Sequence, residues 1–512
     1  MNHLRNISGN QIVWAITLLL GLMCAAVLGS LIGGQDFRTL ALFMSGCIVI
    51  ATFLALGKHY WLLIPLSIGA KFPAIPLGGR SIDFPELAIA CCFVFFVLRV
   101  ATRHENLHLF RSVNTPILLF MAWVFIIFTL NPVGLAFFGS ATAGGRFYIK
   151  LVLAFAAFAI LSNRTYTEND IKWVLGLLVF GAFFGMIYGI AEYAVVGPQV
   201  DPTTGIVQES FYTWHQVLSW PAITLAFLIF SRWGPKEIFG LRQPLALITY
   251  ICCLALVLLS GKRMGLTAVL LAPVVSAIMY RQFIFLPIAI AAFLVIVVTL
   301  VSGQGQWFNL PIVAQRTLSW LPGDWDHQLD SMRGGADEWR AALRRIAITN
   351  IQRDPIVGRG FFVDFQEAMT AIDMQSRGGD LDVQVASYAL GRSWHNIWLG
   401  YAADFGIPIS IIQAFLFAWV LIIAARLFRT VEGFSYQRVF VLYLFIFTIR
   451  DLATSWTSGH SSVDAFNRWW MYGIMVAIYL QNKVSRGYAP RLEPAKTVAD
   501  KFRAATPVNN LF

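Results

Sequence analysis

Residues 115–130 read TPILLFMAWVFIIFTL, and this run contains no charged side chain. A helix needs roughly 20 such residues to cross the hydrocarbon core of a bilayer, where its backbone polar groups must be satisfied within the helix. Comparable apolar runs recur along the whole chain. They occupy 11–33, 38–57, 59–71, 84–101, 115–130, 147–162, 171–196, 212–231, 244–260, 264–281, 283–302, 395–426, 437–454 and 466–482.

The composition agrees with this pattern. Of the 512 residues, 58% are hydrophobic and 13% are charged, whereas soluble domains carry about 25% charged residues. We therefore predict an all-α polytopic membrane protein with about 12–14 transmembrane helices. The run 59–71 is short, so a re-entrant segment is an alternative there. Gly406, Ile407 and Pro408 predict a break in the run 395–426, because proline removes a helix hydrogen bond.

Lysine and arginine predict the orientation, because they concentrate in cytoplasmic loops. With the N-terminus inside, 20 of the 38 basic residues lie inside, nine lie on short outer loops and nine lie in 303–394. Both termini are therefore predicted to be cytoplasmic. The predicted parts are an N-terminal transmembrane bundle (1–302), a large periplasmic helical loop (303–394), C-terminal transmembrane helices (395–482) and a basic cytoplasmic tail (483–512).

The loop 303–394 contains nine arginines, no lysine and eleven acidic residues. Arginine grips phosphate or carboxylate with a flat fork of donors, although a coding bias toward arginine is an equal alternative. Within the loop, residues 336–355 have the apolar spacing of an amphipathic helix that carries Arg340 and Arg344 one turn apart. These arginines would bind either lipid phosphate at the membrane surface or a phosphate of a substrate.

Two cationic pairs lie on the predicted outer side, against the general trend. Lys262 and Arg263 occupy the hairpin SGKRMGL, and Arg146 and Lys150 lie one helical turn apart in GGRFYIKLVL. Ionisable groups at a membrane are costly and are therefore functional candidates. The pairs would either snorkel to lipid phosphates or bind an anionic headgroup of a substrate.

The stretch GRSWHNIWLGYAADFGIPIS (391–410) places His395 and Asn396 where the polar loop meets an apolar helix. Histidine has a free pKa near neutrality, which suits a general base. Asn396 would hold a substrate or a backbone group. Asp404 lies about 13 Å further along a straight helix, so it would orient His395 directly only if the chain bends.

These residues resemble the O-antigen ligase and O-antigen polymerase superfamily. RSWHNIWLGYAADFGIPIS is similar to its His-Asn, Leu, acidic and Gly motif. RDPIVGRGFF (353–362) is similar to its upstream Gly-x-Gly segment, and LLSGKRMGLTAVL (258–270) to its outer hairpin with an arginine. The matching motifs cover about 70 residues plus the hairpin, and fourteen apolar segments exceed the usual twelve or so.

The resemblance implies an inverting, metal-independent glycosyltransferase at the periplasmic face of the bacterial inner membrane. It would move a glycan from undecaprenyl pyrophosphate to a sugar hydroxyl of another glycan or of lipid A-core. His395 would be the catalytic base, Arg263 would bind the pyrophosphate, and Asn396 and Asp404 would bind or orient the acceptor. Weaker candidates for the pyrophosphate are Lys262, Arg146, Lys150, Arg340 and Arg344.

No cofactor, metal or nucleic acid is expected. Besides the donor, the acceptor and the lipid bilayer, other polysaccharide-assembly proteins are candidate partners. The alternative function is a transporter or flippase for a lipid-linked or anionic solute, which predicts that Asp404 matters more than His395. A scaffold for polysaccharide assembly is a third class, and it gives no reason for His395 or Arg263.

Overall fold

The structure is a computed structural model of the chain. It describes residues 56–69, 75–77, 80–105, 107–108, 111–132, 145–196, 199–200, 207–208, 211–361, 385, 389, 392, 394–431, 433, 435–456 and 461–485. The chain divides into two compact units, Met1–Leu62 and Leu63–Phe512. The predicted segments 11–33 and nearly all of 38–57, and most of the predicted tail, lie outside the described residues. In the first unit, a 3-10 helix, η2, spans Gly57–Leu62.

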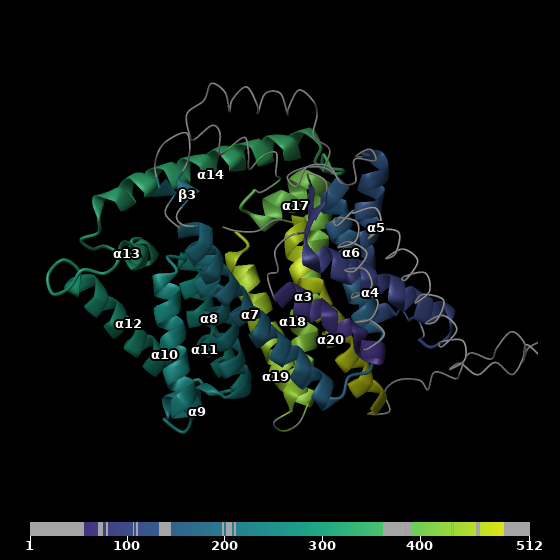
Figure 1. Ribbon diagram of the computed structural model, residues 1–512, viewed down its shortest axis with the longest axis horizontal. Coiled ribbons are helices and arrows are strands. Elements are labelled where there is room, and N and C mark those ends of the chain that lie inside the picture. Colours follow the sequence, from purple (N-terminus) through teal and green to yellow (C-terminus); the bar gives the residue numbers. More distant parts are fainter. Residues whose placement is uncertain are drawn as a thin grey trace, which may run out of the picture. The chain divides into compact units, whose positions relative to one another are not determined.

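The second unit is built from helices (Figure 1). They are α3 (Leu63–Gly69), α4 (Phe84–Ala101), the 3-10 turn η3 (Ser112–Asn114), α5 (Thr115–Leu130), α6 (Gly145–Ser162), α7 (Glu168–Val196), α8 (Phe211–Arg232), α9 (Pro235–Phe239), α10 (Pro244–Leu259), α11 (Arg263–Tyr280), α12 (Phe285–Gly303), α13 (Ile312–Leu318), α14 (His327–Arg353), α17 (Ile397–Phe405), α18 (Ile407–Thr430), α19 (Tyr436–Thr454) and α20 (Ser461–Ser485).

Two short antiparallel strand pairs accompany the helices in the described part of the chain. Strand β1 (Ile75–Leu77) pairs with β2 (Arg80–Ile82), with Ile75 opposite Ile82. Strand β3 (Gln199–Val200) pairs with β4 (Val207–Gln208), with Gln199 opposite Gln208. These strands form the turns between helices and leave the bundle all-helical in character.

Six described helices are long and apolar enough to cross a bilayer, and three shorter ones are similarly apolar. Their outward side chains are large and apolar; Phe125 on α5 is 66% exposed and Leu245 on α10 is 75% exposed. Such surface is unfavourable in water and suits lipid. The prediction of an all-α polytopic membrane protein is confirmed, and each predicted segment from 84 onward coincides with described helix.

Helix α3 is seven residues long, which is far below the roughly 20 residues that span a bilayer. It packs inside the unit against α4 and α7, and its Ser67 is fully buried. In the described part of the predicted segment 59–71, the chain therefore forms a short helix preceded by a 3-10 turn.

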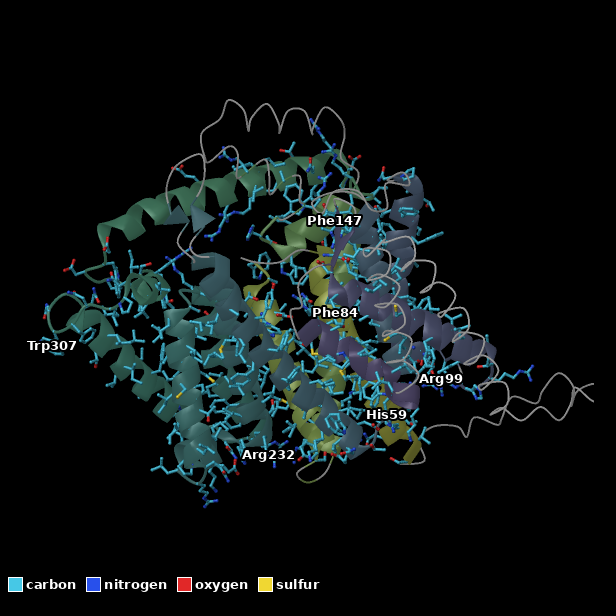
Figure 2. The ribbon with its side chains drawn as sticks, viewed as in Figure 1. His59, Phe84, Arg99, Phe147, Arg232 and Trp307 are labelled. Carbon is cyan, nitrogen blue, oxygen red and sulfur yellow. The ribbon has the colours of Figure 1, made fainter. Side chains whose placement is uncertain are left out.

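Among the described helices, α6 and α20 form the most extensive pair. Gly473 allows this approach, because a Cβ atom there would lie 2.8 Å from the Phe158 carbonyl oxygen. Small residues permit such close packing between helices in membranes. Phe147 of α6 and Arg232 of α8 lie at opposite ends of the bundle (Figure 2), so the helices separate a Phe147 end from an Arg232 end.

Helix α14 runs across the bundle at the end where α17 lies (Figure 1). The helix predicted for 336–355 is part of α14, which begins earlier, at His327, and ends at Arg353. Its apolar face packs on protein: Leu343 and Ala347 are buried against Trp394 and Ala403. Helix α14 is therefore packed against the end of the bundle where α17 lies.

Candidate functional site

The predicted break in 395–426 is confirmed: α17 ends at Phe405 and α18 begins at Ile407. Gly406 joins them with φ +81°, a left-handed backbone that favours glycine. Proline at the second position of α18 is compatible with a helix start, since its missing N–H has no partner there. The break turns the chain and separates α17 from α18.

The loop segment 355–360 docks on this break through its backbone. Ile407 N–H donates to Pro355 O (2.8 Å), Arg359 N–H to Ala403 O (3.1 Å) and Gly360 N–H to Asp404 O (2.6 Å). A Cβ atom at Gly358 would lie 2.4 Å from Gly406 N. The Gly-x-Gly segment thus permits close contact between two backbones, and a side chain at Gly358 would prevent this packing.

Rings from three elements close around the docked segment. Phe361 packs against Tyr148 of α6 (centroids 4.9 Å apart) and against Phe405 of α17 (5.0 Å). Trp123 of α5 donates its indole N–H to Phe405 O at 2.8 Å. The end of α17 is thereby fixed to α5 and α6, which makes it a rigid support for the residues at its start.

Asn396 caps α17. Its Oδ1 accepts the backbone N–H groups of Trp398 and Leu399, both at 3.0 Å, which satisfies two donors at the helix start. The next backbone N–H, of Ile397, donates to Ser455 O at the end of α19 (2.8 Å). Asn396 was predicted to hold a substrate or a backbone group, and its side-chain oxygen binds two backbone N–H groups.

His395 directly precedes this cap. It has φ +49°, a left-handed conformation that few non-glycine residues adopt and that histidine tolerates better than most. Its side chain is partly buried. Strained backbone of this kind is enriched at functional sites, and here it falls on the residue predicted to be the base.

Asp404 is fully buried, and its Oδ1 accepts the indole N–H of Trp394 at 3.1 Å. The chain therefore does bend before α17, because the residue preceding His395 reaches the far end of the helix. Asp404 contacts the neighbour of His395 through this bond. Among the predicted site residues, His395 and Asn396 directly precede α17, and Asp404 lies in its last turn and is linked to their end of the helix through Trp394.

Arg263 is the first residue of α11, directly after the tight turn from α10. Its Nε donates to Arg316 O (3.2 Å) and its Nη2 to Ser319 Oγ (2.8 Å), at the C-terminal end of α13. Lys262 is the N-cap residue of α11. The predicted hairpin is present, and the two hydrogen bonds of Arg263 link it to α13, near the start of the loop 303–394.

Arg146 and Lys150 lie one turn apart on α6 and face two carboxylates at the start of α4. Arg146 Nη2 is 3.1 Å from Asp83 Oδ2 and 3.2 Å from Glu86 Oε2. Lys150 Nζ is 3.3 Å from Asp83 Oδ2 and 3.5 Å from Glu86 Oε1. This quartet of two cations and two anions was missed, because the carboxylates are about 60 positions earlier in the chain.

Arg340 and Arg344 lie on α14 as predicted. Arg344 is exposed and its Nε donates to Arg340 O (3.3 Å), while Arg340 is partly buried. Because α14 packs on Trp394 and Ala403, both arginines belong to the helix that covers α17.

An ionic cluster between α19 and α20 was not predicted. Asp451 is 3% exposed and its two carboxylate oxygens face Arg450 Nε (3.2 Å) and Arg468 Nε. Arg450 also lies over the Phe447 ring, 4.6 Å from its centroid. Ser455, one turn after Asp451, holds the start of α17. The sequence signal for this cluster was the position of Asp451, Arg450 and Arg468 at the ends of otherwise apolar runs.

Among the described residues, no group of three or more His, Cys, Asp and Glu side chains could hold a metal ion. Buried ion pairs lie among the apolar helices, and the helix that begins at the Asn396 cap is broken at Gly406. These features define a polytopic helical membrane protein whose candidate site lies at one end of the bundle. Residues 248–414 match the family model described as O-antigen ligase. The predicted resemblance to the O-antigen ligase/polymerase superfamily is thereby confirmed.

The matched range contains the hairpin, α14, the docked loop segment, α17 and the start of α18. It also contains His395, Asn396, Asp404, Arg263, Arg340 and Arg344, whereas Arg146 and Lys150 precede it. No curated protein matches the chain. The family indicates glycosyl transfer of the O-antigen ligase/polymerase type in general.

Proposed function

We propose that this protein is an inverting, metal-independent glycosyltransferase of the ligase or polymerase type. It moves a glycan from undecaprenyl pyrophosphate to a sugar hydroxyl, on another glycan or on lipid A-core, at the periplasmic face of the bacterial inner membrane. The observation that carries the proposal is His395, held in a left-handed turn at the start of α17 within the range that matches the family.

His395 is the general base in this proposal. It takes the proton of the acceptor hydroxyl as that oxygen attacks the anomeric carbon, and the bond from this carbon to the pyrophosphate oxygen breaks. Pyrophosphate is a good leaving group, so the site needs cations to stabilise its developing charge more than it needs an acid. Direct attack inverts the configuration of the anomeric carbon.

The arrangement of the cations favours Arg263 over Arg146 and Lys150 as a ligand of the pyrophosphate. Arg146 and Lys150 already face Asp83 and Glu86 at 3.1–3.5 Å, so their charge is balanced locally. Arg340 and Arg344 lie on the helix that covers α17. Arg263 keeps its guanidinium oriented through Arg316 and Ser319, and a pre-oriented fork is what phosphate recognition requires.

The test uses two substitutions of His395 in a strain that lacks the gene. His395→Asn keeps a residue type that tolerates the left-handed backbone but removes the base, and His395→Ala removes the ring. Both variants are expected at normal level in the membrane, with loss of surface glycan and accumulation of the lipid-linked donor. His108→Asn, a histidine on the loop between α4 and α5, is the control.

The accumulated material separates the two types of transferase. Unjoined single repeats indicate a polymerase, and long unattached chains indicate a ligase. An unchanged glycan ladder with His395→Asn would refute the proposal. Loss of the glycan with Asp404→Asn but not with His395→Asn would favour the transporter.

A further inference from the structure

The indole of Trp394 lies back along α17. Its Nε1 donates to Asp404 Oδ1 at 3.1 Å, and Trp394 and Asp404 are 2% and 0% exposed. Trp394 precedes the helix start whereas Asp404 is in its last turn. A side chain reaches that far only when it folds along the helix axis, so the chain reverses its direction between Trp394 and Ile397.

Gly400 provides the surface on which the indole rests. A Cβ atom at Gly400 would lie 3.2 Å from Trp394 Cδ1, which is tighter than ordinary van der Waals contact. The helix therefore presents bare backbone where the ring crosses it. Trp394, Gly400 and Asp404 together form what we term the indole latch.

The reversal that the indole latch requires takes place at His395. Its φ of +49° is the left-handed value, and Arg392, on the other side of Trp394, also has a left-handed φ of +51°. Such a conformation is unfavourable for an L-residue and persists where the surrounding structure imposes it. The latch on one side of His395 and the Asn396 cap on the other impose it here.

Asp404 is itself held at both its backbone and its side chain. Its carbonyl oxygen accepts Gly360 N–H, and the ring of the next residue, Phe405, packs in the cluster with Tyr148 and Phe361. The anchor of the latch is therefore fixed to α6 and to the docked loop segment. A residue that positions a catalytic group must itself be held in place by its surroundings.

We propose that Trp394 and Asp404 are positioning residues whose hydrogen bond holds the His395 backbone in its left-handed conformation and thereby aims the imidazole. The inference rests on the proposed function, in which His395 is the base. Asp404 acts as a hydrogen-bond acceptor in this role and transfers no proton.

Three variants separate this role from others. Trp394→Phe keeps the buried ring and removes the N–H donor. Asp404→Asn keeps an oxygen that accepts the indole N–H, and Asp404→Leu removes it. Trp325→Phe is the matched control, because it deletes an indole N–H that donates to Leu321 O (2.8 Å) elsewhere in the same loop.

The purified full-length variants would be assayed in proteoliposomes with lipid-linked glycan extracted from the deletion strain. Trp394→Phe and Asp404→Leu are expected to lower kcat on the order of 10- to 100-fold, the usual effect of a misplaced catalytic group. The KM for the donor should change much less. Asp404→Asn and Trp325→Phe should retain kcat close to the unmodified protein.

A second readout does not depend on turnover. Diethyl pyrocarbonate modifies exposed imidazoles, and the rate at His395 is measured by mass spectrometry of the peptide. Trp394→Phe and Asp404→Leu should change this rate, whereas Asp404→Asn and Trp325→Phe should not. If the unmodified protein transfers no glycan, the proposed function fails, and the labelling rates still decide whether the latch positions His395.

Two results would overturn the inference. One is a Trp394→Phe variant with unchanged kcat and unchanged labelling of His395. The other is an Asp404→Asn variant as impaired as Asp404→Leu, because the carboxylate itself would then be needed.

Discussion

Trp398 of α17 donates its indole N–H to Ser455 Oγ at 2.8 Å, and this bond joins the start of α17 to the end of α19. The backbone adds a second link, from Ile397 N–H to Ser455 O. The helix that directly follows the candidate base is thus tied to the helix that carries Asp451. Ser455 is 1% exposed, so the acceptor of both bonds is buried.

We expect the Trp398 and Ser455 side chains to be coupled. Trp398→Phe and Ser455→Ala should each lower the free energy of unfolding by about 1 kcal/mol, the net worth of a buried hydrogen bond. The double variant should lose little more than either single variant. Unfolding by sodium dodecyl sulfate in mild detergent micelles measures this cycle, and additive losses would show that the bond carries no coupling.

Gly406→Ala should destabilise the protein strongly. A residue other than glycine at φ +81° costs on the order of 1–3 kcal/mol, and the added Cβ would also lie 1.9 Å from Ile356 O. Gly433→Ala is the matched control, because Gly433 has φ +73° with nothing within 4 Å of the added atom. The difference between the two unfolding midpoints gives the cost of the backbone clash, and equal midpoints would contradict the docking of 355–360.

Arg146→Gln tests whether Arg146 is structural. It leaves Lys150 as the remaining cation of the quartet with Asp83 and Glu86, so we expect a loss of stability on the order of 2 kcal/mol, with the more exposed Asp83 partly screened by solvent. Arg146→Gln combined with Glu86→Gln should recover most of the stability and most of the transfer activity. Recovery of stability without activity would instead make Arg146 a ligand of the donor.

Arg263→Lys and Ser319→Ala separate anchoring of α13 from binding of pyrophosphate. Ser319→Ala removes one of the two hydrogen bonds that orient Arg263 and should cost about 1 kcal/mol of stability, with a much smaller loss of transfer than Arg263→Lys because the bond to Arg316 O remains. Arg263→Lys loses the planar fork and should lower transfer on the order of 100-fold at a normal level in the membrane. Equal effects of both changes on membrane level and on activity would reduce Arg263 to an anchor.

The sequence predicts what is local. Apolar runs predicted α4 to α8, α10 to α12 and α17 to α20, because a segment in lipid must satisfy its own backbone, whereas the short helices α9 and α13 were not predicted and α14 begins earlier than its predicted start. Gly406, Ile407 and Pro408 predicted the break between α17 and α18, because their backbone preferences act within a turn or two. His395, Asn396 and the hairpin arginine stood out by neighbours in the chain, and the family match covers them.

The partners of these residues were decided only by the tertiary structure. Asp83 and Glu86 balance Arg146 and Lys150 across a long stretch of chain, and Asp451 of α19 is joined to α20 through Arg468. Burial makes an uncompensated charge so costly that packing must supply a partner, but no spacing says which one. The same holds for His395: its residue type is in the sequence, and its left-handed turn exists because Trp394 folds back over Gly400 to reach Asp404.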